Sequence, residues 1–102
     1  MPKAQTAHVP VFLRGNARTR VAEAIRAVLI NRGYSKKDEK YQLCIQDMHY
    51  PLLDLIDPDA DIELDQAKAF AYVYAQRFEE NDGIAFPDYI LFAAYINTCK
   101  KK

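Results

Sequence analysis

The side chains most able to do chemistry stand in one stretch, where an acidic residue occupies every second position. Side chains two residues apart in an extended chain point to the same side, so an extended conformation would gather these carboxylates in one row. Carboxylate oxygens bind hard cations and also suit a basic protein surface. Three interpretations of this stretch are therefore open: a cation-binding site, an anionic contact surface and a solvated acidic linker. The five acids are Asp57, Asp59, Asp61, Glu63 and Asp65.

The loop pattern argues against cation binding. Asp57-x-Asp59-x-Asp61 resembles the opening of an EF-hand calcium loop. The sixth position of that loop needs glycine for a sharp turn, and here it is Ile62. The twelfth position needs a bidentate glutamate, and here it is Lys68. We therefore expect no metal and no cofactor.

The other residue types used in catalysis are scarce. Ser35 is the one serine and is better explained as a helix cap, while His8 and His49 have no partner at a diagnostic spacing. Asp47 and Asp54 could share one side of a bent helix with His49, but a metal site would need a further ligand. The three glycines are isolated and form no phosphate loop. We expect that the protein is not an enzyme.

Length and composition place these residues in one domain. The chain has 102 residues, and half of them are hydrophobic, which suits a single core and argues against disorder. No run resembles a signal peptide or a membrane span, and the two cysteines lack a Cys-x-x-Cys pattern. We expect a cytoplasmic protein with reduced thiols, no membrane contact, a flexible arm at 1–8 and a basic tail at 99–102.

Charge is divided along the chain although the formal net charge is zero. Residues 1–40 hold nine basic and three acidic residues, whereas residues 41–99 hold two basic and eleven acidic residues. Three lysines end the chain. Such a division indicates either one face for an anionic partner or two halves that attract each other on folding, and both remain open.

Hydrophobic periodicity predicts a mainly α, single-domain bundle of about four helices. The first helix starts from the cap Asn16, covers residues 17–31 and stops at Gly33. The second starts at a capping box, Ser35-Lys36-Lys37-Asp38. Its apolar spacing continues through Pro51, which favours either one kinked helix or two short helices.

The last two helices are the elements around which the chain is organised. The first extends from its cap Asp65 to Asn81 or Gly83, and the second opens with Phe86-Pro87-Asp88. Residues 89–96 have almost no polar face, so this helix must be buried on most sides or against a partner. The main core is expected to contain Phe70, Val73, Phe78, Leu91 and Phe92.

The chain before these helices favours a short extended segment. Val9, Val11 and Leu13 alternate with Pro10 and Phe12, and the proline confines the segment to a sheet edge. Pairing of this segment with another copy of the chain would give a homodimer.

This segment, the next two helices and the turn Arg32-Gly33-Tyr34-Ser35 together resemble the ribbon-helix-helix family of DNA-binding dimers. The resemblance covers residues 8 to about 50 and implies a transcriptional regulator whose paired strands enter the major groove. Pro10, Phe12 and the valines depart from it, because the family presents polar base-reading side chains there. The resemblance implies nucleic-acid contacts by Arg14, Arg18, Arg20 and Arg26.

The interpretation that we favour is a small non-enzymatic protein-binding module of bacterial or phage type. It would act as an adaptor, an inhibitor or a regulatory subunit, and a nucleic-acid-processing machine is one candidate target. The seven tyrosines suit an interface, because their rings can be buried while their hydroxyls stay wet. The partner expected is a protein with a basic surface, bound by Asp57, Asp59, Asp61, Glu63, Glu79, Glu80 and Asp82.

Glu79, Glu80 and Asp82 stand at the carboxyl end of a predicted helix, where the helix dipole disfavours negative charge. Arg77 is the one basic residue close to them in the sequence. Compensation must come from basic groups elsewhere in the fold or from a cationic partner, and we expect the partner.

Overall fold

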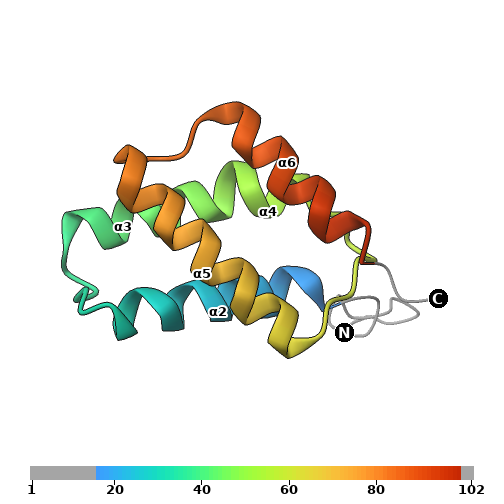
Figure 1. Ribbon diagram of the computed structural model, residues 1–102, viewed down its shortest axis with the longest axis horizontal. Helices are drawn as coiled ribbons and strands as arrows, with labels where there is room; N and C mark the ends of the chain where they lie inside the picture. The colour runs from blue at the N-terminus through green and yellow to red at the C-terminus, as the bar shows by residue number, and fades with distance from the viewer. Residues whose placement is uncertain (1–15, 100–102) are drawn as a thin grey trace, which may run out of the picture.

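Apolar residues at helical spacing give the chain four main helices, which the computed structural model arranges as a bundle over the described residues, 16–99 (Figure 1). No strand occurs in this range. The predicted mainly α fold is confirmed. The arm 1–8, the extended segment 9–13 and residues 100–102 lie outside the described residues. The elements are α2 (Ala17–Asn31), α3 (Glu39–Asp47), the π-helical turn η1 (Met48–Leu52), α4 (Leu53–Leu55), α5 (Leu64–Asn81) and α6 (Phe86–Asn97).

The core centres on the crossing of α2 and α5, the pair of helices in closest contact (Figure 1). Helix α2 contributes Val21, Ile25 and Leu29, which are fully buried and recur at helical spacing. Helix α5 packs a stripe of small and aromatic side chains against α2. The small side chains let the two backbones approach closely, and the rings fill the remaining space. That stripe contains Ala67, Phe70, Ala71, Tyr74, Ala75 and Phe78.

Pro51 divides the second predicted helix into two segments. Helix α3 ends at Asp47, and inside the following π-helical turn Tyr50 has extended dihedrals of φ −152° and ψ 114°. The Tyr50–Pro51 peptide bond is cis. The apolar spacing survives the break, because Cys44, Met48 and Leu52 are all fully buried. Of the two alternatives predicted for this region, the structure therefore has two helical segments.

The amino ends of α2 and α5 differ from the predicted caps. Helix α5 begins at Leu64, so Glu63 and not Asp65 is its N-cap residue. The Glu63 N–H donates to Gln66 Oε1 at 3.2 Å, and this reciprocal contact starts the helix earlier than predicted. The Asn16 side chain does not cap α2; its Oδ1 accepts instead from the Ile62 N–H at 3.0 Å.

The predicted capping box at residues 35–38 forms only in part. Asp38 Oδ2 accepts from the Ser35 N–H at 2.7 Å, as expected. Ser35 Oγ, however, accepts from the Lys37 N–H at 3.2 Å, and α3 begins at Glu39 with Asp38 as its N-cap residue. The pair therefore closes a turn before the helix, because the chain needs one more bend before α3 can meet the core.

Helix α6 lies on the outside of the bundle against η1 and α4, so it buries one face through Tyr89, Ala93 and Ile96. Phe70 and Phe78 are buried as predicted, and Phe92 is half-buried against the core. The core assignment was wrong for two residues. Val73 is 50% exposed because it borders an open groove beside α6, and Leu91 is 66% exposed because it lies on the outer side of α6.

Candidate functional site

The acidic linker, residues 56–63, is fixed in place through its main chain. Arg18 Nε donates to the Ile56 carbonyl, and Arg20 Nη1 donates to the Ile62 carbonyl, each at 2.8 Å. Ala60 and Ile62 are buried as well. The charge division along the sequence is thus used inside the fold, since two arginines of the basic half hold the backbone of the acidic half.

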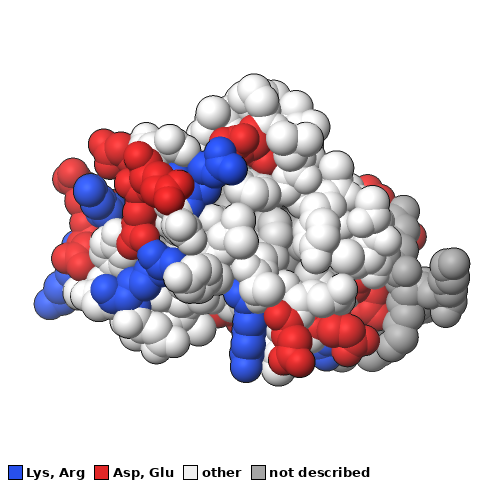
Figure 2. Space-filling model, in the orientation of Figure 1, with Lys and Arg blue, Asp and Glu red and all other residues white. Residues whose placement is uncertain are grey.

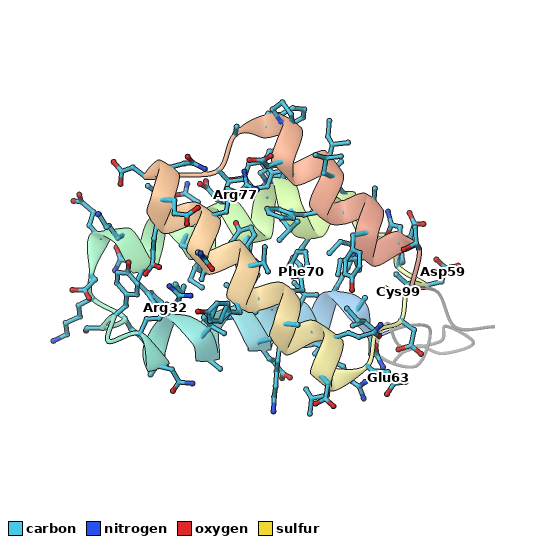
Figure 3. All side chains as sticks on the ribbon, viewed as in Figure 1. Arg32, Asp59, Glu63, Phe70, Arg77 and Cys99 are labelled. Atoms are coloured by element: carbon cyan, nitrogen blue, oxygen red, sulfur yellow. The ribbon has the colours of Figure 1, made fainter. Side chains whose placement is uncertain are left out.

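The linker does not form the single extended row expected of its acids. The Ala60 N–H donates to the Asp57 carbonyl at 3.1 Å, which closes a turn before the chain extends through residues 60–63. Asp59 and Glu63 are exposed and Asp61 is half-buried. Figure 3 shows Asp59 and Glu63 at the same end of the bundle, where α5 begins and α6 ends.

The other three predicted binding acids lie at the far end of α5, an 18-residue helix about 27 Å long. The seven predicted partner-binding residues therefore form two groups and not one surface (Figure 2). Each of the three has a contact within the fold. Glu80 Oε2 accepts from Gln76 Nε2 at 3.1 Å, and Asp82 Oδ1 lies 3.6 Å from Lys40 Nζ.

Glu79 is the most firmly held of these acids. Its Oε1 pairs with Arg32 Nη1, and its Oε2 accepts from the Tyr34 hydroxyl at 2.9 Å. Burial, together with this bond to Glu79, raises the pKa of Tyr34. For Glu79 the compensating charge is thus a basic residue of the first half of the chain. Arg77 does not compensate it, because Arg77 pairs with Asp88 at 3.7 Å.

The described arginines of the nucleic-acid alternative are engaged within the fold, although Arg18 and Arg26 line one hollow beside His49. Arg18 and Arg20 donate to linker carbonyls, and Arg26 Nη2 lies 3.0 Å from His49 Nε2. Arg14 lies outside the described residues. Each of the three arginines that the structure describes is thus already held by a contact within the fold.

Sequence reasoning missed a groove between α5 and α6. It encloses about 270 Å³. Phe70 forms its centre, since its ring meets Phe92 edge-on at a centroid distance of 5.4 Å and lies parallel to Tyr95 at 6.4 Å. Edge-on and offset ring pairs of this kind are favourable, so the aromatic rings form an apolar floor. The lining residues are Ala69, Phe70, Val73, Phe92 and Tyr95.

Different charges lie beyond the two ends of the groove. On the side where α5 starts there is a separate hollow of about 160 Å³, which is lined in part by Asp61, Glu63 and Cys99. Toward the end of α5 stands the ion pair of Arg77 with Asp88. Figure 3 shows Arg77, Phe70, Cys99 and Glu63 in this order from the end of α5 toward its start. The site is therefore acidic at one end and apolar in its middle, with an ion pair at the other end.

Uncharged surface spreads beyond the groove over α6 and the middle of α5 (Figure 2). Tyr72, Val73 and Tyr95 are each about half exposed. The signal that could have located this surface is the missing polar face of residues 89–96, which requires either burial or a partner. The sequence alone is compatible with burial inside the fold and with contact to a partner. Because α6 lies at the edge of the bundle, part of its apolar surface is exposed.

The buried ionisable groups Cys44, Tyr74 and Tyr89 belong to the core, and the Tyr74 ring lies 5.7 Å from that of the groove residue Phe92. Burial raises the pKa of the Cys44 thiol to about 12, so the thiol stays protonated near neutrality. Burial likewise raises the pKa values of Tyr74 and Tyr89. Among residues 16–99, no three His, Cys, Asp or Glu side chains are placed to hold a metal ion. None of the helices described is long and apolar enough to cross a membrane.

Comparison with known proteins finds no matching family model, no matching curated protein and no matching solved structure. The chemistry of the groove is therefore the ground on which a function can be argued.

Proposed function

We propose that the protein is a small non-enzymatic protein-binding module, and that the groove between α5 and α6 takes an amphipathic segment of a partner protein. The observation that carries this proposal is the combination of an open aromatic floor with an acidic end. An adaptor, an inhibitor or a regulatory subunit would act in this way, by occupying a protein surface. The two free cysteines suit a cytoplasmic setting, which is part of the proposal.

The floor supplies the affinity in this proposal. Val73 and Tyr95 leave about half of their surface in water, and both border the ring of Phe70. A partner side chain placed between them would be covered on several sides, which is the setting of interface residues that contribute most to binding. A helix or an extended segment with apolar side chains on one face is the natural occupant of such a groove.

The acidic end supplies the orientation. Asp61 and Glu63 flank the hollow at the start of α5, so a lysine or arginine of the partner would enter there. The linker that carries both acids is already ordered by the bonds from Arg18 and Arg20. A surface that is formed before binding loses little conformational entropy when the partner arrives.

Only part of the predicted acidic surface belongs to this site. Asp61 and Glu63 line the hollow beside the groove, and Asp57 and Asp59 precede them in the same linker. Glu79, Glu80 and Asp82 lie at the other end of α5, about 27 Å along the helix from this linker and beyond the Arg77–Asp88 pair. The DNA-binding alternative has less support than the groove, because Arg18 and Arg20 already donate to linker carbonyls.

Peptide display against the full chain tests the proposal and works with a partner that is still unidentified. Peptides selected on the parent protein should combine leucine or aromatic residues with a basic residue at one end. The same peptides should lose at least tenfold in affinity for Val73→Glu, which places a charge on the apolar floor. The control is Ile30→Glu, because Ile30 is 43% exposed on α2 and lies outside the groove.

A second variant tests the orientation. Glu63→Lys should shift the selected peptides from basic to acidic residues at that end, since the charge facing the partner is reversed. Because Glu63 also caps α5, Glu63→Gln is the control for the loss of the carboxylate, and circular dichroism checks that both variants are folded. Capture from a lysate of the source organism, followed by mass spectrometry, would then identify the natural partner. Selected peptides that bind Val73→Glu as tightly as the parent would refute the groove as the site.

A further inference from the structure

Helix α6 has a second apolar surface that the groove does not use. Phe92 and Tyr95 face α5, and Tyr89, Ala93 and Ile96 face the core. Helical spacing places a third set of residues on the side of α6 that faces away from the core. Neighbouring members of this set are one or two turns of the helix apart. All of them are exposed and uncharged. This stripe consists of Pro87, Ile90, Leu91 and Ala94.

We propose that this stripe is the contact between two copies of the chain, which pair through their α6 helices in a symmetric, antiparallel dimer. In a two-fold contact the same surface serves both copies, so it must be complementary to itself. A stripe of uncharged residues at i, i+3, i+4 and i+7 meets that requirement, because it packs as a ridge into the matching groove of a second helix. Ala94 also lets the two backbones approach closely.

The charges around α6 favour a second copy. Asp88 is the one charged residue between Phe86 and Asn97, and it faces Arg77 of α5. Two stripes can therefore meet without bringing like charges together, and the zero net charge adds no overall repulsion between copies. A helix that binds a membrane surface generally carries lysine or arginine on its polar face, whereas the opposite face of α6 is packed on the core.

The exposed area sets the expected strength. Ile90 is 51% exposed, Leu91 is 66% exposed, and Phe86 at the start of the helix is 60% exposed. With roughly 150–250 Å² for each large side chain, these three offer about 300–400 Å² per copy. The small residues and the backbone between them bring the total for both copies to about 1,000 Å², near the lower limit for a specific interface. We therefore expect a weak dimer, with a midpoint on the order of tens of micromolar.

Sedimentation velocity on the full chain, from about 1 to about 500 μM, tests this dimer. The parent should pass from monomer to dimer across the range. Leu91→Glu should weaken association at least tenfold, because the two carboxylates would face each other near the two-fold axis. The matched control is Ile30→Glu, which places the same charge on a half-exposed aliphatic position of α2 and should dimerise as the parent does.

A pair of oppositely charged variants separates a specific dimer from general stickiness. Leu91→Lys alone should also be monomeric, but an equal mixture of Leu91→Glu and Leu91→Lys should recover association, since unlike charges then meet at the axis. Circular dichroism should show both variants folded, because Leu91 lies outside the core. If either variant is unfolded, the same exchange at Ala94 replaces it.

Three results would overturn the inference. The parent could stay monomeric throughout the range, Leu91→Glu could associate like the parent, or the mixture could fail to recover. Flotation with vesicles of mixed neutral and anionic lipids adds a fourth such result. In that case the parent would be monomeric and bind the vesicles, and the Leu91→Glu variant would not bind them. The inference does not rest on the groove, because Leu91→Glu should still bind the groove peptides and Val73→Glu should still dimerise.

Discussion

Helices α5 and α6 follow one another in the chain and are both rich in apolar residues, yet they are packed very differently. Helix α5 crosses the middle of the bundle and buries a full stripe on α2, with charged residues on its outer side. Helix α6 lies at the edge, buries three residues on η1 and α4, and leaves Ile90 and Leu91 in water. The more hydrophobic of the two helices is therefore the less buried.

This difference shows that hydrophobicity identifies a surface that must be covered, but not what covers it. A helix that is apolar all round is normally buried. In α6 only one side is covered by the bundle, and another faces the groove beside α5. Several apolar residues of α6 stay exposed although they do not contribute to the core. Both proposals above therefore place partners on α6.

The rates at which the two cysteines are modified should differ more than any other property compared between the core and the edge of the bundle. Cys44 is fully buried in the core, and burial raises its thiol pKa to about 12, whereas Cys99 follows α6 and is half-buried. Modification of Cys44 should require global unfolding, which suppresses its rate at least about a thousandfold when stability is in the usual range of about 5–15 kcal/mol. Mass spectrometry after timed alkylation measures both rates. Rapid labelling of Cys44 in the folded protein would contradict the closed core.

Phe78→Ala should have the largest effect on stability. Phe78 is buried near the end of α5, and its truncation leaves a cavity that the surrounding helices cannot fill. We expect a loss of about 3–5 kcal/mol in the free energy of unfolding, measured by urea denaturation. Phe92→Ala should cost about half as much, since Phe92 is only partly buried. An equal loss for both variants would remove the distinction between the helices.

Glu79 and Glu80 should respond oppositely to the same substitution. Either change to glutamine relieves roughly 0.3–1 kcal/mol of unfavourable interaction with the dipole of α5. Glu79→Gln, however, also weakens the contacts with Arg32 and Tyr34, so we expect it to be less stable by about 0.5 kcal/mol. Glu80→Gln should match the parent or be slightly more stable. Thermal unfolding at low salt resolves the signs, and two equal shifts would show that the Arg32 pair contributes nothing.

Leu91→Ala should have the smallest effect on stability. Because Leu91 is 66% exposed, its truncation removes little buried area, and we expect a change within about 0.5 kcal/mol at low protein concentration. The measurement should use a concentration at which the proposed dimer is dissociated. A loss comparable to that of Phe78→Ala would place Leu91 in the core after all.

Local patterns in the sequence located most helix ends, because those ends depend on nearby residues. Helix α6 begins at Phe86 with Pro87 in its first turn as predicted, and α5 ends at Asn81, followed by Asp82 in the left-handed region (φ 53°). The Gly83 N–H then bonds to the Phe78 carbonyl at 2.9 Å. Both signals act within a few residues of the helix end, so periodicity and capping rules suffice for them.

The features that could not be predicted depend on residues far apart in the chain. Arg18 and Arg20 form their bonds with residues about forty positions later, and no local pattern indicates that partnership. The exposure of Val73 depends likewise on where α6 lies, since a valine at helical spacing fits either a core or a groove wall. The acids of the linker were found from the sequence, but the groove between α5 and α6 was not.

The acidic linker also bears on how this protein could change over time. The fold holds that segment through main-chain atoms and through the small or aliphatic residues Ala60 and Ile62. The atoms that accept from Arg18 and Arg20 are peptide carbonyls, which are the same in every residue type, so these two bonds do not require a particular side chain in the linker. The path of the linker backbone is thus set largely apart from its charge, with the exception of Glu63, whose side chain also caps α5. Natural variation or laboratory design could change the charge of the linker while these two main-chain bonds are kept.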